Sequence, residues 1–217
     1  CKSETTQEDP TNQHCSGAEV GLPYFLFTSE PALPRQVCPS WGWLYPKRDI
    51  KRTPTVVLMG LDSSGKSTLL FMLQTGVVMD TSPTVGFNVA TLDLNKKTAL
   101  TVWDVGGQAK MMANWKYYLE GCKAMVFVVD SSDRARIGEA QKALKKVLSD
   151  DNMKGIPLMV LANKKDLPNS MNIREVSNQL ELPSYKDRAW EIQACSGLKG
   201  MGLQQAFLSV AKLIKKS

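Results

Sequence analysis

The stretch Gly60-Leu-Asp-Ser-Ser-Gly-Lys-Ser67 follows the apolar run Thr55-Val-Val-Leu-Met59 and precedes the helix-like sequence Thr68-Leu-Leu-Phe-Met-Leu-Gln74. A strand, a glycine-rich loop and a helix start in this order build a cradle whose backbone N–H groups face phosphate oxygens. We expect Lys66 to neutralise the β- and γ-phosphates and the Ser67 hydroxyl to ligate Mg²⁺. The stretch therefore predicts a nucleoside triphosphate site, and the alternative is a chance match in a turn.

A second motif, Trp103-Asp-Val-Gly-Gly-Gln108, comes at the end of the predicted strand 99–103. Asp104 is suited to hold Mg²⁺ through water, and the Gly107 backbone N–H can meet the γ-phosphate. The Gln108 side chain can orient an attacking water molecule. This motif favours hydrolysis of the triphosphate over simple binding.

Two further motifs indicate which base is bound. Asn163-Lys-Lys-Asp166 follows the predicted strand 157–162, and Ser196-Gly-Leu198 follows the predicted strand 190–194. The Asp166 carboxylate can accept from the N–H groups on the N1/N2 edge of guanine, which adenine lacks, and a backbone N–H after the last strand can reach the guanine O6. Each motif alone is compatible with a solvated loop. In this order after a phosphate loop they favour GTP over ATP.

These motifs, together with Pro83-Thr-Val-Gly-Phe-Asn88, resemble the small GTPases and, within them, the ADP-ribosylation-factor-like branch; the resemblance covers about residues 53–215. It implies that Thr84, in the segment called switch I, closes over Mg²⁺ and the γ-phosphate. It also implies that Gln108 is the catalytic residue and that Ser67 and Thr84 are the metal ligands. The implied contacts to the nucleotide and its metal are Gly60, Leu61, Asp62, Ser63, Ser64, Gly65, Lys66, Ser67, Thr68, Thr84, Asp104, Gly107, Asn163, Lys164, Asp166, Ser196 and Gly197.

The resemblance further implies an aromatic triad of Phe87, Trp103 and Tyr118 that rearranges between nucleotide states and presents a surface to effectors. For Trp103, ordinary core packing is the alternative. Ala109 and Met112 depart from the family pattern, which often has an acidic residue and an arginine at these positions. The segment called switch II has therefore lost two charges, which puts the identity of its partners in doubt.

Alternating strand and helix patterns from Thr53 onward predict an α/β architecture, the P-loop small GTPase fold. We expect a mostly parallel six-stranded sheet, flanked by helices, with one antiparallel hairpin formed by residues 87–94 and 98–103. Helices are expected near Asp133–Leu148, Asn172–Leu180 and Leu203–Ile214. The predicted GTPase domain spans residues 53–217, after an irregular or disordered leader, residues 1–52.

The leader begins with cysteine and contains no methionine, so we expect the chain to be a fragment or a processed product. Its segment Trp41-Gly-Trp-Leu-Tyr45 is either an interfacial membrane anchor or part of a disordered leader. Five cysteines without metal-ligand spacing favour a reduced, cytoplasmic protein. A net charge of +6 permits attraction to anionic lipid, so peripheral membrane association stays open. Because the basic residues are scattered and no nucleic-acid-binding motif is present, we expect no nucleic acid partner.

The sequence therefore predicts a GTP-binding molecular switch that hydrolyses GTP to GDP and phosphate with Mg²⁺ and regulates membrane trafficking or signalling. We expect an exchange factor, a GTPase-activating protein and effectors to bind through switch I and switch II. No arginine lies between Gly76 and Thr84, so hydrolysis should be slow without the activating protein. The alternatives are a GTP-binding interaction module with negligible turnover and another P-loop enzyme such as a nucleotide kinase. The Asn163–Asp166 motif and the lack of an arginine-rich lid argue against the kinase.

Overall fold

The computed structural model describes residues 53–217. The predictions made for residues 1–52, including the leader and its aromatic segment, lie outside the described residues. In chain order the elements are β1 (Thr55–Met59), α1 (Lys66–Thr75), β2 (Phe87–Asn95), β3 (Thr98–Val105), α2 (Ala109–Met112), η1 (Trp115–Tyr118), β4 (Ala124–Asp130), α3 (Ile137–Leu148), η2 (Asp151–Met153), β5 (Leu158–Asn163), α4 (Ile173–Gln179), η3 (Leu182–Ser184), β6 (Trp190–Ala194) and α5 (Leu203–Lys216).

The sheet has six strands in the order β2-β3-β1-β4-β5-β6. Only β2 and β3 pair antiparallel, and the other neighbours pair parallel. In the turn between β2 and β3, the Asn95 Oδ1 accepts from the Lys97 backbone N–H at 2.9 Å. The predicted mostly parallel sheet with one hairpin is therefore confirmed.

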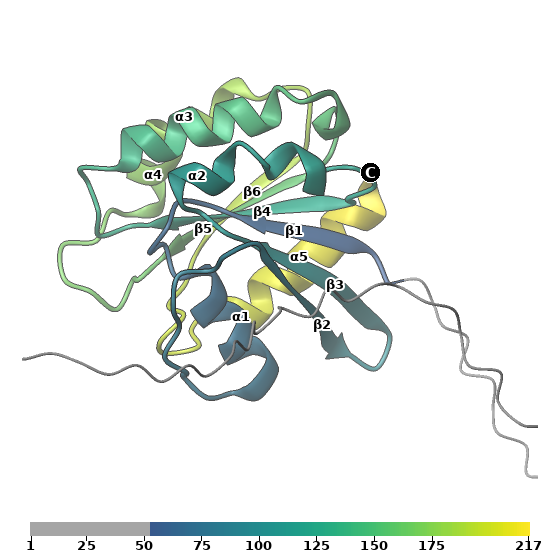
Figure 1. The fold of residues 1–217 in the computed structure, drawn as a ribbon, viewed down its shortest axis with the longest axis horizontal. Helices are drawn as coiled ribbons and strands as arrows, with labels where there is room; N and C mark the ends of the chain where they lie inside the picture. The colour runs from purple at the N-terminus through teal and green to yellow at the C-terminus, as the bar shows by residue number, and fades with distance from the viewer. Residues whose placement is uncertain (1–52) are drawn as a thin grey trace, which may run out of the picture. The chain divides into compact units, whose positions relative to one another are not determined.

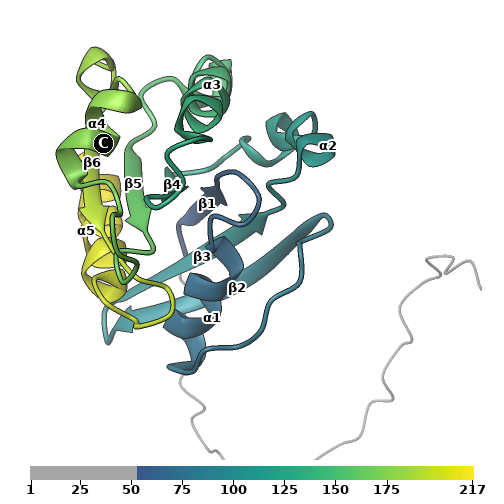
Figure 2. The ribbon, with the colours of Figure 1, turned by 90° about the vertical axis from the view of Figure 1, so that its left-hand side faces the viewer.

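Helices cover both faces of the sheet (Figures 1 and 2). α2, α3 and α4 lie on one face, and α1 and α5 lie on the other. Successive side chains of β1 alternate between the two hydrophobic clusters that result, with Val57 and Met59 in the first and Val56 and Leu58 in the second. Because β4 is buried along almost its whole length, its apolar run is continuous rather than alternating.

The helix starts show how local side chains set boundaries. α3 begins at Ile137 rather than near Asp133 as expected, and in the turn before it the Asp133 carboxylate accepts from the Arg136 backbone N–H at 3.1 Å. α4 begins as expected after Asn172, whose side chain accepts from the Glu175 N–H while the Glu175 carboxylate accepts from the Asn172 N–H.

The helix α5 packs its apolar side against the sheet. Leu203, Phe207, Val210 and Leu213 are buried on this side, and the helix covers the predicted range Leu203–Ile214. Among residues 53–217, none of the helices combines the length and the apolar composition that crossing a bilayer requires.

Candidate functional site

Most of the predicted site residues line one cavity, formed by loops that follow strands of the sheet. The loop between β1 and α1 lies at the centre of these loops, with α2 on one side and β5 and β6 on the other (Figure 2). The cavity has a volume of about 280 Å³. The predicted residues that line it are Asp62, Ser63, Gly65, Lys66, Ser67, Thr68, Thr84, Gly107, Gln108, Asn163, Lys164, Asp166 and Gly197. The others, Gly60, Leu61, Ser64, Asp104 and Ser196, lie behind this lining.

The phosphate loop is held together by its own polar groups. The Lys66 Nζ donates to the carbonyl oxygens of Gly60 at 3.1 Å and Leu61 at 2.9 Å, and the Ser64 hydroxyl donates to Leu61 at 2.8 Å. Burial lowers the pKa of Lys66 to about 8, although the carboxylates of Asp104 and Asp62 act in the opposite direction. A polyanion in the cavity would offset this desolvation of the ammonium group.

Three oxygen-bearing side chains meet beside the loop. The Ser67 hydroxyl lies 2.9 Å from the Thr84 hydroxyl and donates to the Asp104 Oδ2 at 2.6 Å. Burial raises the pKa of Asp104, opposed by the hydrogen bond from Ser67, the charge of Lys66 and the hydrogen bond from Asn88. The Asp104 Oδ1 is buried without a hydrogen-bond partner. A hard divalent cation prefers oxygen ligands, so this cluster fits Mg²⁺.

The segment after β3 is fixed against the phosphate loop. The Asp62 N–H donates to the Gly107 carbonyl at 3.1 Å, and a side chain at Gly107 would collide with the Gly60 carbonyl oxygen. The Trp115 Nε1 donates to the Gly106 carbonyl at 2.9 Å, a contact that the sequence analysis missed. Gln108 lines the cavity, and its Oε1 is buried without a hydrogen-bond partner. This amide oxygen therefore has an unused capacity to accept a hydrogen bond.

Asn163 joins the phosphate loop to the opposite wall of the cavity. Its Nδ2 donates to the Ser64 carbonyl at 2.8 Å, and its Oδ1 accepts from the Gly197 N–H at 2.9 Å. Its side chain is almost fully buried, and Gly65 passes so close that a Cβ there would collide with the Asn163 amide. Both ends of this amide are thus engaged by the protein, as is the Gly197 N–H.

Other side chains of the two base motifs form hydrogen bonds and an ion pair, with each other or with a neighbouring strand. The buried Ser196 hydroxyl donates to the Asp166 carboxylate and accepts from the Lys199 N–H at 3.1 Å. The Lys164 Nζ pairs with the Asp130 carboxylate at 2.6 Å. Ser196 therefore orients Asp166 through its side chain, a role that the sequence analysis did not assign to it.

Four residues that line the cavity were not predicted: Thr81, Ser82, Pro83 and Leu198. The Thr81 hydroxyl lies 3.1 Å from the Thr68 hydroxyl, which brings switch I beside the start of α1. Thr81, Ser82 and Pro83 directly precede Thr84, and Leu198 directly follows Gly197. This closeness in the sequence to predicted site residues was the signal that could have identified them.

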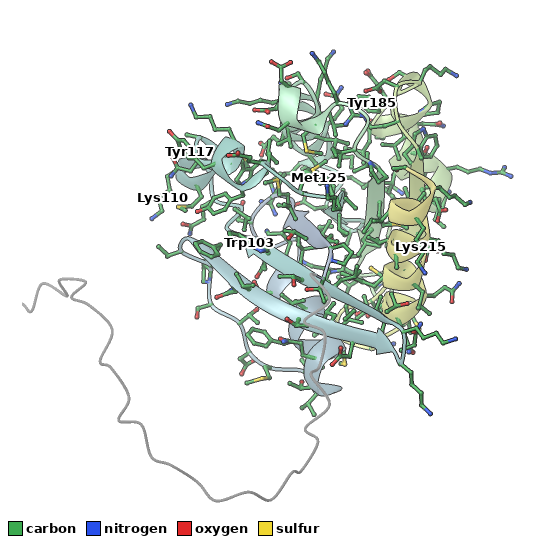
Figure 3. The ribbon with its side chains drawn as sticks, turned by 90° about the vertical axis from the view of Figure 1, so that its right-hand side faces the viewer. Trp103, Lys110, Tyr117, Met125, Tyr185 and Lys215 are labelled. Carbon is green, nitrogen blue, oxygen red and sulfur yellow. The ribbon has the colours of Figure 1, made fainter. Side chains whose placement is uncertain are left out.

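The expected aromatic triad comes together beside the cavity. The rings of Phe87 and Trp103 stack with centroids 5.1 Å apart, and Tyr118 lies 5.3 Å and 6.3 Å from them. Phe87 is 45% exposed, so the triad reaches the surface and is not purely core packing. Trp103 lies on the same side of the molecule as Tyr117 and Lys110 (Figure 3). Met112, at the position of a lost charge, packs against the first hydrophobic cluster.

Comparisons with known proteins agree with this geometry. The sequence model of the ADP-ribosylation factor family matches residues 45–214. The chain is 48% identical to ADP-ribosylation factor K of Dictyostelium discoideum over 161 residues, 74% of this chain and 85% of that protein, and 45% identical to ADP-ribosylation factor J with the same coverage. It is also similar to the solved structure of the Arl6 BBS3 small GTPase from Trypanosoma brucei with the bound nucleotide analogue GppNp. The TM-score is 0.69 at 30% identity, over 76% of this chain and 98% of that chain.

Proposed function

Because the chain belongs to the ADP-ribosylation factor family, we propose that it is a GTP-binding molecular switch that hydrolyses GTP to GDP and phosphate. One observation carries the proposal. A phosphate loop, an oxygen cluster that fits Mg²⁺, the glutamine Gln108 and the carboxylate Asp166 all converge on one cavity.

The phosphate end of the cavity would bind and orient the triphosphate. Lys66 would donate to the β- and γ-phosphate oxygens while its other contacts keep it against the loop. Ser67 and Thr84 would hold Mg²⁺ directly, and Asp104 would hold it through water. The metal, when bound, supplies positive charge that offsets the charge of the β- and γ-phosphates.

The hydrolytic step would depend on a water molecule held by Gln108. Its unpartnered Oε1 can accept one hydrogen bond from that water and fix its orientation for attack on the γ-phosphorus. The Gly107 N–H would donate to the γ-phosphate, because the close packing of Gly107 on the phosphate loop fixes its position. The water oxygen would form a bond to the γ-phosphorus while the bond from that phosphorus to the bridging oxygen breaks. The bridging oxygen would leave with GDP, and the proton lost by the attacking water would pass to the phosphate product.

The other end of the cavity would select guanine. Asp166, oriented by Ser196, would accept from both N–H groups of the guanine edge. Asn163 would support this end by tying the base motifs to the phosphate loop, and Lys164 would cover the base with its aliphatic chain.

Partners of the switch would bind next to the γ-phosphate. Switch I, residues 76–84, and switch II, residues 107–118, lie next to the aromatic triad, where Phe87, Val85 and Val89 are exposed. We propose that an exchange factor, an activating protein and effectors use this surface. Regulation of membrane trafficking or signalling, from a peripheral position on a membrane, is the role that fits such a switch.

The direct test uses the purified full chain with GTP, GDP and ATP. We expect GTP and GDP to bind in competition and far more tightly than ATP, with slow release of phosphate from bound GTP. Equal affinity for ATP would contradict the guanine site. Tight GTP binding with no phosphate release, alone or with an activating protein, would favour the interaction module.

Ser67→Asn should bias the protein toward GDP. The substitution removes the hydroxyl that contacts both Thr84 and Asp104, and the metal contributes more to binding the triphosphate than the diphosphate. We expect GTP affinity to fall by roughly 10² or more, with a smaller loss for GDP. Titrations with Mg²⁺ and with a chelator measure this, and a wild-type GTP affinity that chelation leaves unchanged would contradict the metal role.

A further inference from the structure

The phosphate loop contains the carboxylate of Asp62, whose negative charge disfavours the binding of phosphate groups. Asp62 lines the cavity, and its backbone N–H donates to Gly107 in the same wall. A negative side chain beside a polyphosphate raises the free energy of binding because like charges repel, and water screens only part of this repulsion for the Asp62 side chain, which is 47% exposed. The Lys66 ammonium offsets part of this charge, and a second cation facing Asp62 would offset more of it.

Arg136, in the turn before α3, makes contact with that carboxylate. Its Nη1 donates to the Asp62 Oδ1 at 3.2 Å, and its Nε donates to the Asp133 Oδ2 at 2.6 Å. Asp133 in turn fixes the backbone of Arg136 by accepting from its N–H. The guanidinium therefore has a defined position beside the phosphate loop, although Arg136 does not line the cavity itself.

The contact has two interpretations. In the first, Arg136 only stabilises the turn before α3 through Asp133. In the second, its reach to Asp62, 74 positions away in the sequence, serves the nucleotide site. A partly exposed ion pair contributes little to the free energy of unfolding. Its effect on the charge that a bound polyphosphate would experience is larger, because Asp62 lines the cavity that would hold the ligand.

We propose that Arg136 is a positioning residue for nucleotide binding: it neutralises Asp62 and holds its carboxylate toward α3, and it thereby favours GTP over GDP. The proposal rests on the GTP-binding function proposed above. GTP carries one more negative charge than GDP, so an uncompensated Asp62 would weaken GTP binding more than GDP binding. Arg136 thus makes an acidic phosphate loop compatible with a triphosphate ligand.

The test measures GTP and GDP affinities of the full chain at low salt. We expect Arg136→Gln to weaken GTP binding about tenfold, with a smaller effect on GDP, since a charge near the ligand loses its partner. Adding Asp62→Asn to this variant should restore most of the lost GTP affinity, because the repelling charge is then gone. High salt should reduce the effect of Arg136→Gln.

Arg134→Gln is the matched control. Arg134 lies in the same turn and pairs with Glu175 at 3.3 Å, away from the phosphate loop, so its loss should leave both affinities unchanged. Equal effects of the two arginine substitutions, or a loss in Arg136→Gln that Asp62→Asn does not restore, would overturn the proposal and leave Arg136 with a role in the turn alone. If the wild type itself does not bind GTP, the proposed function fails instead.

Discussion

Asp166→Asn is expected to weaken GTP binding by about 10⁴, because a site built to hydrogen-bond two N–H groups loses that much when the pairing is broken. The asparagine amide can accept from only one of the two guanine N–H groups and presents its own NH₂ to the other. Xanthine has a carbonyl oxygen at that position and would accept from this NH₂. We therefore expect the variant to prefer XTP over GTP.

Competition binding with GTP, XTP and ATP measures this change in base preference. The Ser196 hydroxyl can still hydrogen-bond the asparagine side chain, so the loop should keep its position. Asp93→Asn is the control, since Asp93 is exposed on β2 and does not line the cavity. If Asp166→Asn and Asp93→Asn behave alike, guanine is not recognised through Asp166.

The phosphate loop and the placement of each later motif after a strand could be predicted because the signals are local. Each motif follows directly on an apolar strand, so its residues reach the same edge of the sheet once the strands are parallel. The hairpin of β2 and β3 was predictable for the same reason, since its short polar turn lies between two strand patterns. The site residues within these motifs accordingly lie in or directly behind one cavity.

Contacts between distant segments could not be predicted in this way. The sequence motif places Asn163 near the base, but only the structure shows that its amide joins Ser64 to Gly197. The Asp133 side chain favours a helix start in the sequence, yet it forms a turn that directs Arg136 toward Asp62. These roles depend on the packing of α3 and β6 against the phosphate loop, which no local pattern encodes.

GTP hydrolysis is expected to be the slow step of the proposed switch, because the described lining of the cavity has no arginine to offset the charge on the transferring phosphoryl group. Among the described residues that line it, none is an arginine, and Arg136 is already engaged by Asp62 and Asp133. Charge on the transferring phosphoryl group would therefore be met by Lys66, the Gly107 N–H and the metal, without an arginine. We expect intrinsic hydrolysis to be very slow, and an arginine supplied by an activating protein to raise its rate by up to about 10⁵.

Gln108→Leu should abolish this stimulated hydrolysis and leave the protein locked with GTP. Leucine has no oxygen to accept from the attacking water, whereas the phosphate loop, the oxygen cluster and the base motifs are untouched, so nucleotide affinity should stay close to that of the wild type. Single-turnover hydrolysis by the full chain, with and without an activating protein, measures the loss. Gln205→Leu, on the exposed side of α5, is the control and should hydrolyse at the wild-type rate. Fast unaided hydrolysis by the wild type would mean that the missing arginine does not limit the reaction, and an equal stimulated rate in Gln108→Leu would mean that Gln108 does not. Either result would contradict the mechanism.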